Sequence, residues 1–102
     1  MEANSDRLRN AIGLAMKAGR VKSGDFIVEK LTRAGELPLV LLDGTASDNT
    51  REKYQKLCAS KQTELLSVCE LGKAIGKPGR MVACVTDENF KNMIIRAASR
   101  AE

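Results

Sequence analysis

A continuous apolar run, LPLVLLD from Leu37 to Asp43, narrows the choice of fold more than any other stretch of this sequence. Pro38 is incompatible with a helix interior, and the residues from Leu39 to Leu42 are all apolar. A strand with one face in water alternates apolar and polar residues, whereas a strand covered on both faces is apolar throughout. The rest of the chain must therefore cover both faces of a sheet.

Helical spacing of apolar residues occurs on both sides of this run. One helix is predicted over residues 5–18, and a second starts after Ser23 and stops at Gly35. The inward side of the second helix is predicted to be Ile27, Val28, Leu31 and Ala34. Later helices are predicted over residues 49–60, within CELGKAIGK and after Thr86, and further strands in TELLSV and MVACVT.

Short polar side chains mark the predicted helix starts, because each can accept a hydrogen bond from a free N–H of the first turn. The predicted caps are Ser5, Ser23, Asn49 in capping-box spacing with Glu52, and Thr86 followed by Asp87 and Glu88. Gly19 and Gly35 suit the positions just past two helix ends.

Helices that alternate with short buried strands predict an α/β protein, a three-layer α/β/α sandwich with a central, mostly covered mixed sheet. The 102 residues fit one domain, spanning 1–102. The first ten residues, MEANSDRLRN, carry charged side chains from the second position on, and no apolar run in the sequence approaches the ~20 residues that cross a bilayer. We therefore expect a cytoplasmic protein with no membrane partner.

Cysteine and histidine usage excludes several kinds of site. The three cysteines, Cys58, Cys69 and Cys84, are odd in number, widely spaced and set in apolar patterns, which is typical of buried reduced thiols. Because the chain has no histidine, a histidine-based nucleophile or acid/base mechanism is excluded. We expect no metal and no cofactor.

Four carboxylates stand where a magnesium site could form in an α/β fold. Asp43, Asp48, Asp87 and Glu88 lie at predicted strand ends or helix starts. Each also suits a capping or turn position, so a metal-dependent hydrolase is the least favoured of the possible functions. The chain is not expected to be an enzyme.

Two glycine-bearing loops resemble phosphate loops but lack their chemistry. In AGRVKSGDF the residues after Gly24 are Asp25 and Phe26, where a P-loop needs lysine and a hydroxyl, and in GKAIGKPGR only three residues separate Gly72 from Gly76. Neither is a nucleotide site, and no small-molecule substrate is expected. The net charge of +4 and the pI of about 9.2 favour an anionic partner of another kind.

The outer face of the second helix is one candidate contact for that partner. At ~100° per residue, Phe26, Lys30 and Arg33 fall within ~60° of one another, opposite the inward side. Lys22 and the free amides after Ser23 lie at the same end and could hold phosphate. The alternative is that Phe26 packs under a neighbouring helix while the cations pair with Asp25 and Glu29.

The loop IGKPGR is the second candidate. Lys77 and Arg80 flank a Pro-Gly turn, where no apolar requirement places them. The alternative is a simple connection to the next strand.

Four phrases, in order along nearly the whole chain, resemble the kink-turn RNA-binding ribosomal proteins of the L7Ae type, in particular their bacterial YlxQ-like members. They are GLAMKAGRVKSG (Gly13 to Gly24), LVLLDGTASDNT (Leu39 to Thr50), LGKAIGK (Leu71 to Lys77) and VACVTDENF (Val82 to Phe90). The resemblance implies an α/β/α sandwich that places the start of the second helix in the widened major groove of a sharply bent RNA, beside sheared G·A pairs.

In the family, a glycine that opens this helix is followed by an Asn-Glu pair that reads guanine edges and, six places on, by a lysine. Gly24 matches the glycine and Lys30 the lysine, whereas Phe26 and Ile27 stand at the Asn and Glu positions. Since neither can hydrogen-bond a base edge, recognition would depend on Lys30 and on backbone contacts to phosphate. The family's second contact, with an extruded nucleotide, corresponds here to residues 75–80.

We therefore expect a ribosome-associated, monomeric RNA-binding protein whose partner is a kink-turn or ribosomal RNA that it recognises by shape and backbone. The residues expected to touch RNA are Lys22, Ser23, Gly24, Asp25, Phe26, Ile27, Lys30, Arg33, Ile75, Gly76, Lys77, Pro78 and Arg80. The alternative is a protein-interaction or ribosome-assembly module with the same fold and little RNA affinity of its own. The RNA-binding hypothesis requires the two candidate segments to meet in space.

Overall fold

A computed structural model describes residues 6–99 of the chain as alternating helices and strands. The helices of this part are α1 (Asp6–Lys17), α2 (Asp25–Arg33), α3 (Asp48–Lys61), α4 (Leu71–Ile75) and α5 (Glu88–Ser99). The strands are β1 (Val21–Ser23), β2 (Leu39–Asp43), β3 (Glu64–Val68) and β4 (Val82–Val85). Each predicted helix and strand is present, within a few residues of its predicted bounds.

The strands form one mixed sheet in the order β1-β4-β2-β3. β2 runs parallel to β3 and antiparallel to β4, and β4 runs antiparallel to β1. β2 is therefore an inner strand, and all five of its residues are buried, as its continuous apolar sequence predicted.

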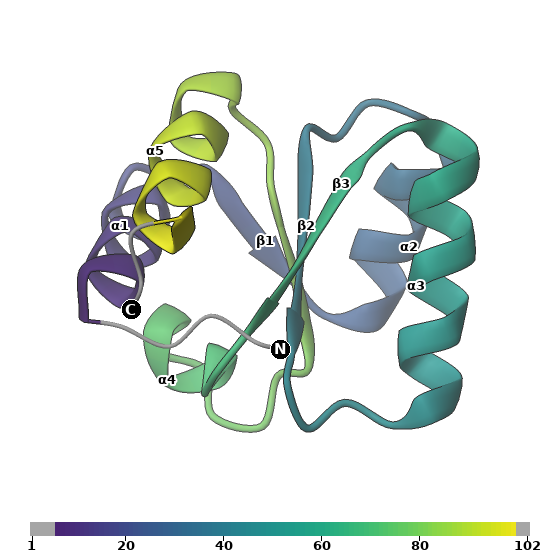
Figure 1. Cartoon of the computed structure of the whole chain (residues 1–102), viewed down its shortest axis with the longest axis horizontal. Coiled ribbons are helices and arrows are strands. Elements are labelled where there is room, and N and C mark those ends of the chain that lie inside the picture. The colour runs from purple at the N-terminus through teal and green to yellow at the C-terminus, as the bar shows by residue number, and fades with distance from the viewer. Residues whose placement is uncertain (1–5, 100–102) are drawn as a thin grey trace.

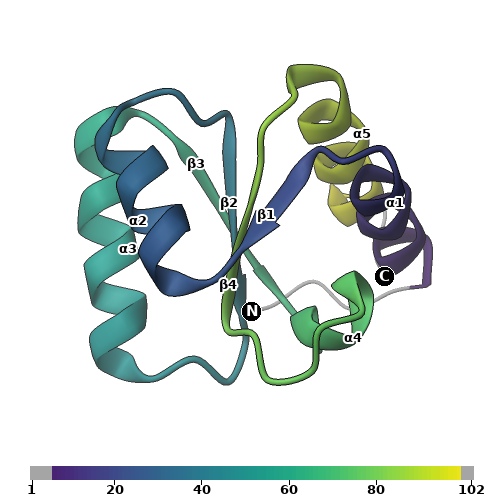
Figure 2. The same cartoon turned by 180° about the vertical axis from the view of Figure 1, so that it is seen from behind.

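Helices cover both faces of the sheet, which confirms the three-layer sandwich (Figures 1 and 2). α1, α4 and α5 pack on one face, where Leu39 and Leu41 of β2 point. α2 and α3 pack on the other face, against Val40 and Leu42. Successive residues of one strand thus enter different apolar cores, because side chains alternate across a pleated sheet.

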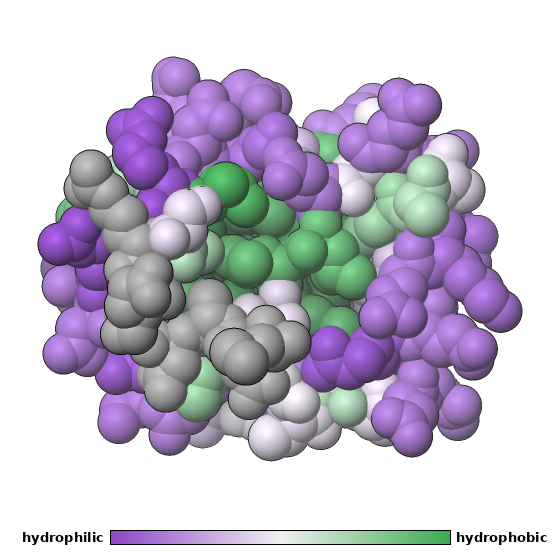
Figure 3. Space-filling model, in the orientation of Figure 1, coloured by the Kyte–Doolittle hydropathy of each residue, from purple (hydrophilic) through white to green (hydrophobic). Residues whose placement is uncertain are grey.

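The residues of the edge strand β3 are buried less completely than those of the inner strands β2 and β4. Leu65 and Leu66 are half-buried, on opposite faces of the sheet. Figure 3 shows apolar side chains along the middle of this side of the molecule, with hydrophilic residues over the helices on either side. No helix within residues 6–99 is both long enough and apolar enough to cross a membrane.

Three of the predicted helix caps are wrong by one or two residues. α2 is preceded by Gly24, with no side-chain cap, because Ser23 belongs to β1. α3 is capped by Ser47, whose hydroxyl accepts from the Thr50 N–H at 3.2 Å, rather than by Asn49. Where several cap-forming residues follow one another, their sequence does not show which one has extended backbone.

At α5 the cap is Asp87 instead of Thr86. The Asp87 carboxylate accepts from the Phe90 N–H at 3.0 Å, while the Thr86 hydroxyl donates to the Arg20 carbonyl at 3.3 Å. The remaining predicted cap, Ser5, lies outside the described residues.

The inward side of α2 also differs from the prediction at one position. Ala34 is exposed because the helix ends at Arg33, and Thr32 is buried instead. The Thr32 hydroxyl donates to the Val28 carbonyl at 2.6 Å, which removes the cost of burying it.

All three cysteines are free thiols, but only two are fully buried. Burial raises the pKa of the Cys58 and Cys84 thiols to about 11, so both stay protonated. Cys69 is half-buried, which corrects the prediction for that residue, because it follows the edge strand β3.

Candidate nucleic-acid interface

Strand pairing brings the start of α2 to the loop between α4 and β4. β1 is antiparallel to β4 with Ser23 opposite Ala83, so the end of β1 lies beside the beginning of β4 (Figure 2). The Gly24 N–H extends this pairing and donates to the Val82 carbonyl at 3.1 Å. The two segments that sequence analysis singled out separately therefore meet at one end of the sheet.

Arg80 joins them directly. Its Nη1 donates to the Ser23 carbonyl at 2.8 Å and to the Ser23 hydroxyl at 2.9 Å. A Cβ on Gly24 would lie 3.0 Å from the same nitrogen, and Gly24 has a φ of 113°, which disfavours any side chain. Glycine at this position lets the arginine lie against the backbone.

Around this junction, cationic and apolar side chains surround a cavity of about 400 Å³. Its lining residues are Met16, Val21, Lys22, Ser23, Ile27, Lys77 and Arg80. Lys22 and Lys77 are exposed, and within residues 6–99 neither forms an ion pair with a carboxylate. Five of the predicted site residues thus share one surface.

The outer face of α2 belongs to the same helix as Ile27, which lines this cavity. The Phe26 side chain is 82% exposed and packs under no neighbouring helix, and Lys30 and Arg33 are exposed on the same face. Arg33 pairs with Glu29 at 2.8 Å, whereas Lys30 has no ion pair among the described residues. We call Lys22, Phe26, Lys30, Lys77 and Arg80 the cationic ledge.

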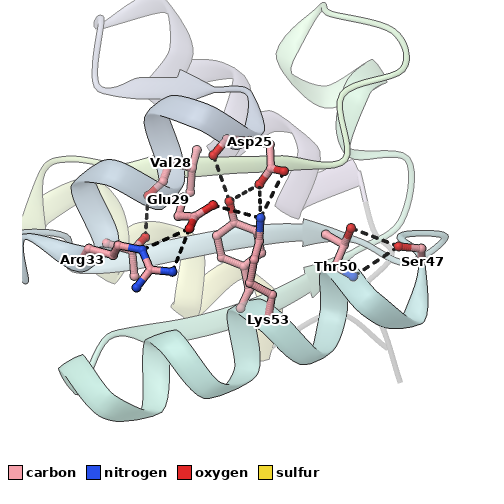
Figure 4. Close-up of polar contacts among 9 residues, drawn as sticks. Asp25, Val28, Glu29, Arg33, Ser47, Thr50 and Lys53 are labelled. Carbon is pink, nitrogen blue, oxygen red and sulfur yellow. Dashed lines mark hydrogen bonds and ion pairs between the residues drawn. The ribbon is translucent and has the colours of Figure 1, made fainter.

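Both carboxylates of α2 point away from the ledge, toward α3 (Figure 4). Lys53 Nζ lies 2.9 Å from Asp25 Oδ1 and 3.0 Å from Glu29 Oε1. The Tyr54 hydroxyl donates to the Asp25 carboxylate and lies 3.1 Å from the Asp25 carbonyl. We call these residues, together with Arg33, the α2–α3 seam.

These contacts keep the groups of the seam ionised. The hydrogen bonds from Tyr54 and Lys53 lower the pKa of Asp25, and those from Arg33 and Lys53 lower the pKa of Glu29. In return, the hydrogen bond to Asp25 raises the pKa of Lys53. Asp25 was predicted to touch RNA, but its carboxylate is held on the α3 side and is not part of the ledge.

The loop after α4 is fixed by close backbone packing. Lys77 N–H donates to the Gly72 carbonyl at 2.8 Å. A Cβ on Gly72 would lie 2.8 Å from the Lys77 carbonyl oxygen and 3.1 Å from the Gly79 nitrogen, so no side chain fits there. Gly76 is exposed and has a φ of 71°. The path of this loop therefore depends on Gly72, within α4, and on Gly76, just after it.

Ile75 is a correction to the predicted site. Its side chain is 3% exposed and belongs to the core formed with α1, α4 and α5, so it offers no surface to a nucleotide. The i, i+4 spacing of Leu71 and Ile75 fits this inward position. Pro78, in contrast, is exposed as predicted.

A second cavity, of about 370 Å³, lies beneath the loop and borders Arg80. Its lining includes Thr45, Lys73, Pro78 and Met81, of which sequence analysis singled out only Pro78. The others belong to separate elements and carry no shared motif, so only the fold brings them together. Met81 is 37% exposed and gives the cavity an apolar wall.

Asp43 organises the floor of this second cavity. Its carboxylate accepts from the Thr45 and Leu71 N–H groups, each at 2.8 Å. Burial alone would raise the pKa of Asp43, but the hydrogen bonds from Thr45 and Leu71 outweigh it and keep the pKa below its usual value. Within residues 6–99, no group of three or more histidine, cysteine, aspartate or glutamate residues could hold a metal ion.

Comparison with known proteins finds sequence relatives over most of the chain. Residues 6–95 match the sequence model described as the ribosomal protein L7Ae/L30e/S12e/Gadd45 family. The chain is 40% identical over 89 residues to RNA-binding protein YlxQ of Bacillus subtilis (strain 168), covering 82% of this chain and 87% of that protein. It is 33% identical over 92 residues to RNA-binding protein YlxQ of Enterococcus faecium, covering 87% and 88%.

Solved structures share the fold. A protein of unknown function from Bacillus halodurans C superimposes with a TM-score of 0.86 at 29% identity, over 94% of this chain and 100% of that chain. The Giardia lamblia 15.5kD RNA binding protein superimposes with a TM-score of 0.75 at 18% identity, over 98% and 91%.

Proposed function

Because this chain belongs to the ribosomal protein L7Ae/L30e/S12e/Gadd45 family, we propose that it is a non-enzymatic protein that binds structured RNA, and that its cationic ledge grips a kink-turn or a similarly bent helix. The relatives from Bacillus subtilis and Enterococcus faecium are both named as RNA-binding proteins, which supports this proposal.

One observation carries the proposal: the two hydrogen bonds of Arg80 to Ser23. They hold the α4–β4 loop against the start of α2, so that Lys22 and Lys77 line one cavity instead of two separate surfaces. Lysine ammonium groups without carboxylate partners are suited to phosphate. The first N–H groups of α2 point toward the same end of the molecule and add donors for an anion.

Recognition would then depend on shape more than on base edges. Phe26 and Ile27 have no hydrogen-bonding side-chain atoms, so Lys30, the cation of α2 that is not paired with a carboxylate within residues 6–99, is proposed to reach a guanine acceptor. Contacts to phosphate fix the position of a protein on its RNA without reading sequence. A bent RNA would be preferred because both segments of the ledge can contact it together.

The second cavity is the proposed place for an extruded nucleotide. Pro78 and Met81 supply its apolar walls, in place of the buried Ile75, and Arg80 connects it to the ledge. Splayed bases of structured RNA are commonly held by such apolar surfaces. We further propose that the protein acts as a monomer in the cytoplasm, at or near ribosomal RNA.

Gel-shift titration tests the proposal. A kink-turn RNA should bind at least about tenfold more tightly than a straight duplex of equal length, a difference of about 1.4 kcal/mol. Equal, weak and strongly salt-dependent binding to both RNAs would reject specific recognition. The double variant Lys22→Ala/Lys77→Ala should bind RNA with a shallower slope of log affinity against log salt concentration, by the amount expected for the loss of about two phosphate contacts. Lys56→Ala, on the exposed side of α3, is the matched control.

The alternative, a protein-interaction or ribosome-assembly module, is favoured by one observation. An aromatic side chain that is 82% exposed, as Phe26 is, can anchor a protein partner. In that case the Lys22→Ala/Lys77→Ala variant would bind RNA as weakly as the native chain does.

A further inference from the structure

The fold leaves the exposure of Phe26 unexplained. The large apolar side chains exposed within residues 6–99 are Leu14 (53%), Phe26 (82%) and Met81 (37%). Phe26 is the most exposed of the three and is a member of neither apolar core. The ring therefore contributes little to either core, and so large an exposed aromatic side chain is typical of a contact with a partner.

The charges around the ring narrow the choice of partner. Lys30 lies one turn further along the same face of α2, and Lys22 lies in the strand that leads into the helix. The two carboxylates nearest in sequence, Asp25 and Glu29, are drawn toward α3 by Lys53 (Figure 4). The ring therefore shares a helix face with Lys30, at the end of the helix that Lys22 precedes, and neither lysine forms an ion pair among the described residues.

This combination differs from a surface made for protein. An exposed aromatic ring flanked by lysines is the arrangement with which proteins hold unpaired nucleotides, since the base stacks on the ring and the backbone phosphates meet the cations. An acidic peptide would satisfy the lysines, but it would leave the ring, which is 82% exposed, without a flat partner to stack on it. The charge pattern favours a base with its phosphates.

We infer that Phe26 is a stacking platform for an unstacked base of the bound RNA, with Lys22 and Lys30 holding the phosphates on either side of it. The inference rests on the proposed function and adds a prediction about which RNAs the protein binds. Stacking accepts any base but requires that the base be free of its own helix. The protein thus selects RNA with an unstacked nucleotide, and not a particular base at that position.

The test compares ring with aliphatic side chains. Phe26→Leu keeps an apolar side chain of similar size, Phe26→Trp keeps a ring, and Phe26→Ala removes both. Kd is measured by gel shift for a kink-turn RNA, for the same RNA without its unpaired nucleotides, and for a single-stranded oligonucleotide. Leu14→Ala, another exposed apolar side chain, is the control.

Phe26→Ala and Phe26→Leu should each raise Kd for the kink-turn RNA about 5- to 150-fold, the range given by about 1–3 kcal/mol per stacked base. Phe26→Trp should bind at least as well as the native chain. On the RNA without unpaired nucleotides, all four proteins should bind equally. 2-Aminopurine placed in the unpaired segment should lose fluorescence with the native chain and not with Phe26→Leu. Thermal unfolding of each variant should match the native chain, because the ring is outside both cores.

The two proposals fail differently. If the native chain binds straight duplex and kink-turn RNA equally, the kink-turn proposal is lost, and the stacking inference is then decided on the single-stranded oligonucleotide with the same variants. If Phe26→Leu binds kink-turn RNA as tightly as the native chain, the stacking inference is overturned and the kink-turn proposal stands. Absence of RNA binding by the native chain, or a concentration-dependent dimer that Phe26→Ala abolishes, overturns the inference as well.

Discussion

Helix α2 separates two surfaces that both carry cations and differ in whether those cations are paired with carboxylates. In the seam with α3, Lys53 and Arg33 lie within 2.8–3.0 Å of carboxylate oxygens. On the ledge, Lys22 and Lys30 form no ion pair among the described residues. A helical repeat of about 100° per residue is enough to divide one short segment into a neutral side and a cationic side.

For RNA binding, the position of each charged side chain therefore matters more than the net charge of the protein. Partly exposed ion pairs contribute only about 0–1 kcal/mol to stability, so the ion pairs of the seam stabilise the fold only weakly. Its larger effect is on the ledge, because Lys53 draws two carboxylates away from the surface where phosphate would bind. Since charges at a protein surface act over about 8–10 Å at ordinary salt, this local arrangement decides the field that an approaching RNA meets.

The largest expected effect comes from breaking the ledge without touching the seam. In Gly72→Ala the new methyl group would clash with backbone atoms of the α4–β4 loop. Backbone atoms cannot move aside as easily as the end of a flexible side chain. We expect a loss of stability in the upper part of the ~1–3 kcal/mol range for overpacking, together with weaker RNA binding. Urea unfolding measures the first effect and gel shift the second.

Gly13→Ala is the control for that substitution. Gly13 lies within α1, and a Cβ there would be 3.9 Å from the Ala74 carbonyl oxygen, which is ordinary van der Waals contact. Alanine is the better helix former, so this variant should be up to ~1 kcal/mol more stable than the native chain. If Gly72→Ala were equally harmless, the loop would not be held as described.

The second prediction sharpens the contrast between paired and unpaired lysines. Lys30→Ala should weaken kink-turn binding by about 1–3 kcal/mol if its ammonium group touches a guanine, and should leave stability unchanged. Lys56→Ala, in a pair 4.0 Å from Glu52, should change neither. Unchanged affinity in Lys30→Ala would remove this lysine from the interface.

The third prediction concerns the seam alone. Tyr54→Phe removes a hydroxyl that bonds to Asp25 from a largely buried position, and should destabilise the protein by about 1–1.5 kcal/mol. The RNA affinity should change by less than the stability does, because the ledge keeps all its cations. A loss of RNA affinity as large as that of Lys30→Ala would show that seam and ledge are not separate.

The smallest expected effect is a pH dependence that originates in the seam. The pKa of Asp25 is lower in the folded chain than its ordinary value of 3.8, so its contribution to stability is complete well above that value. This contribution is lost as the pH falls from 3.8 through the lowered folded value, and for so exposed a group it stays below about 1 kcal/mol. The range from pH 5 to pH 3 brackets the ordinary value of 3.8. Between these two pH values, the melting temperature of Asp25→Asn should therefore change less than that of the native chain. Equal slopes would contradict the pairing.

Much of the fold was predictable from the sequence, because apolar spacing determines which residues are buried. The run from Leu39 to Leu42 gave the covered strand, and the outward position of Phe26 followed from helical spacing alone. Cap positions were less predictable, since Ser47 and Asn49 are chemically similar and only the backbone around them decides between them.

The site could be predicted only where a short segment carried its own pattern. Lys22, Lys77 and Arg80 were found as cations beside glycines, but their meeting depends on the antiparallel pairing of β1 and β4, which no local pattern specifies. The inward position of Ile75 was missed although its i, i+4 spacing with Leu71 indicates it, whereas the ion pair of Asp25 with Lys53 was missed because Lys53 belongs to an element distant in sequence.

The most direct test of the joint ledge is an amide NMR titration of the ¹⁵N-labelled chain with a kink-turn RNA. The account predicts that the amides of residues 22–30 and 76–80 shift together, at one RNA equivalent, while those along the outer side of α3 do not. Shifts confined to one of the two segments, or centred on α3, would contradict it.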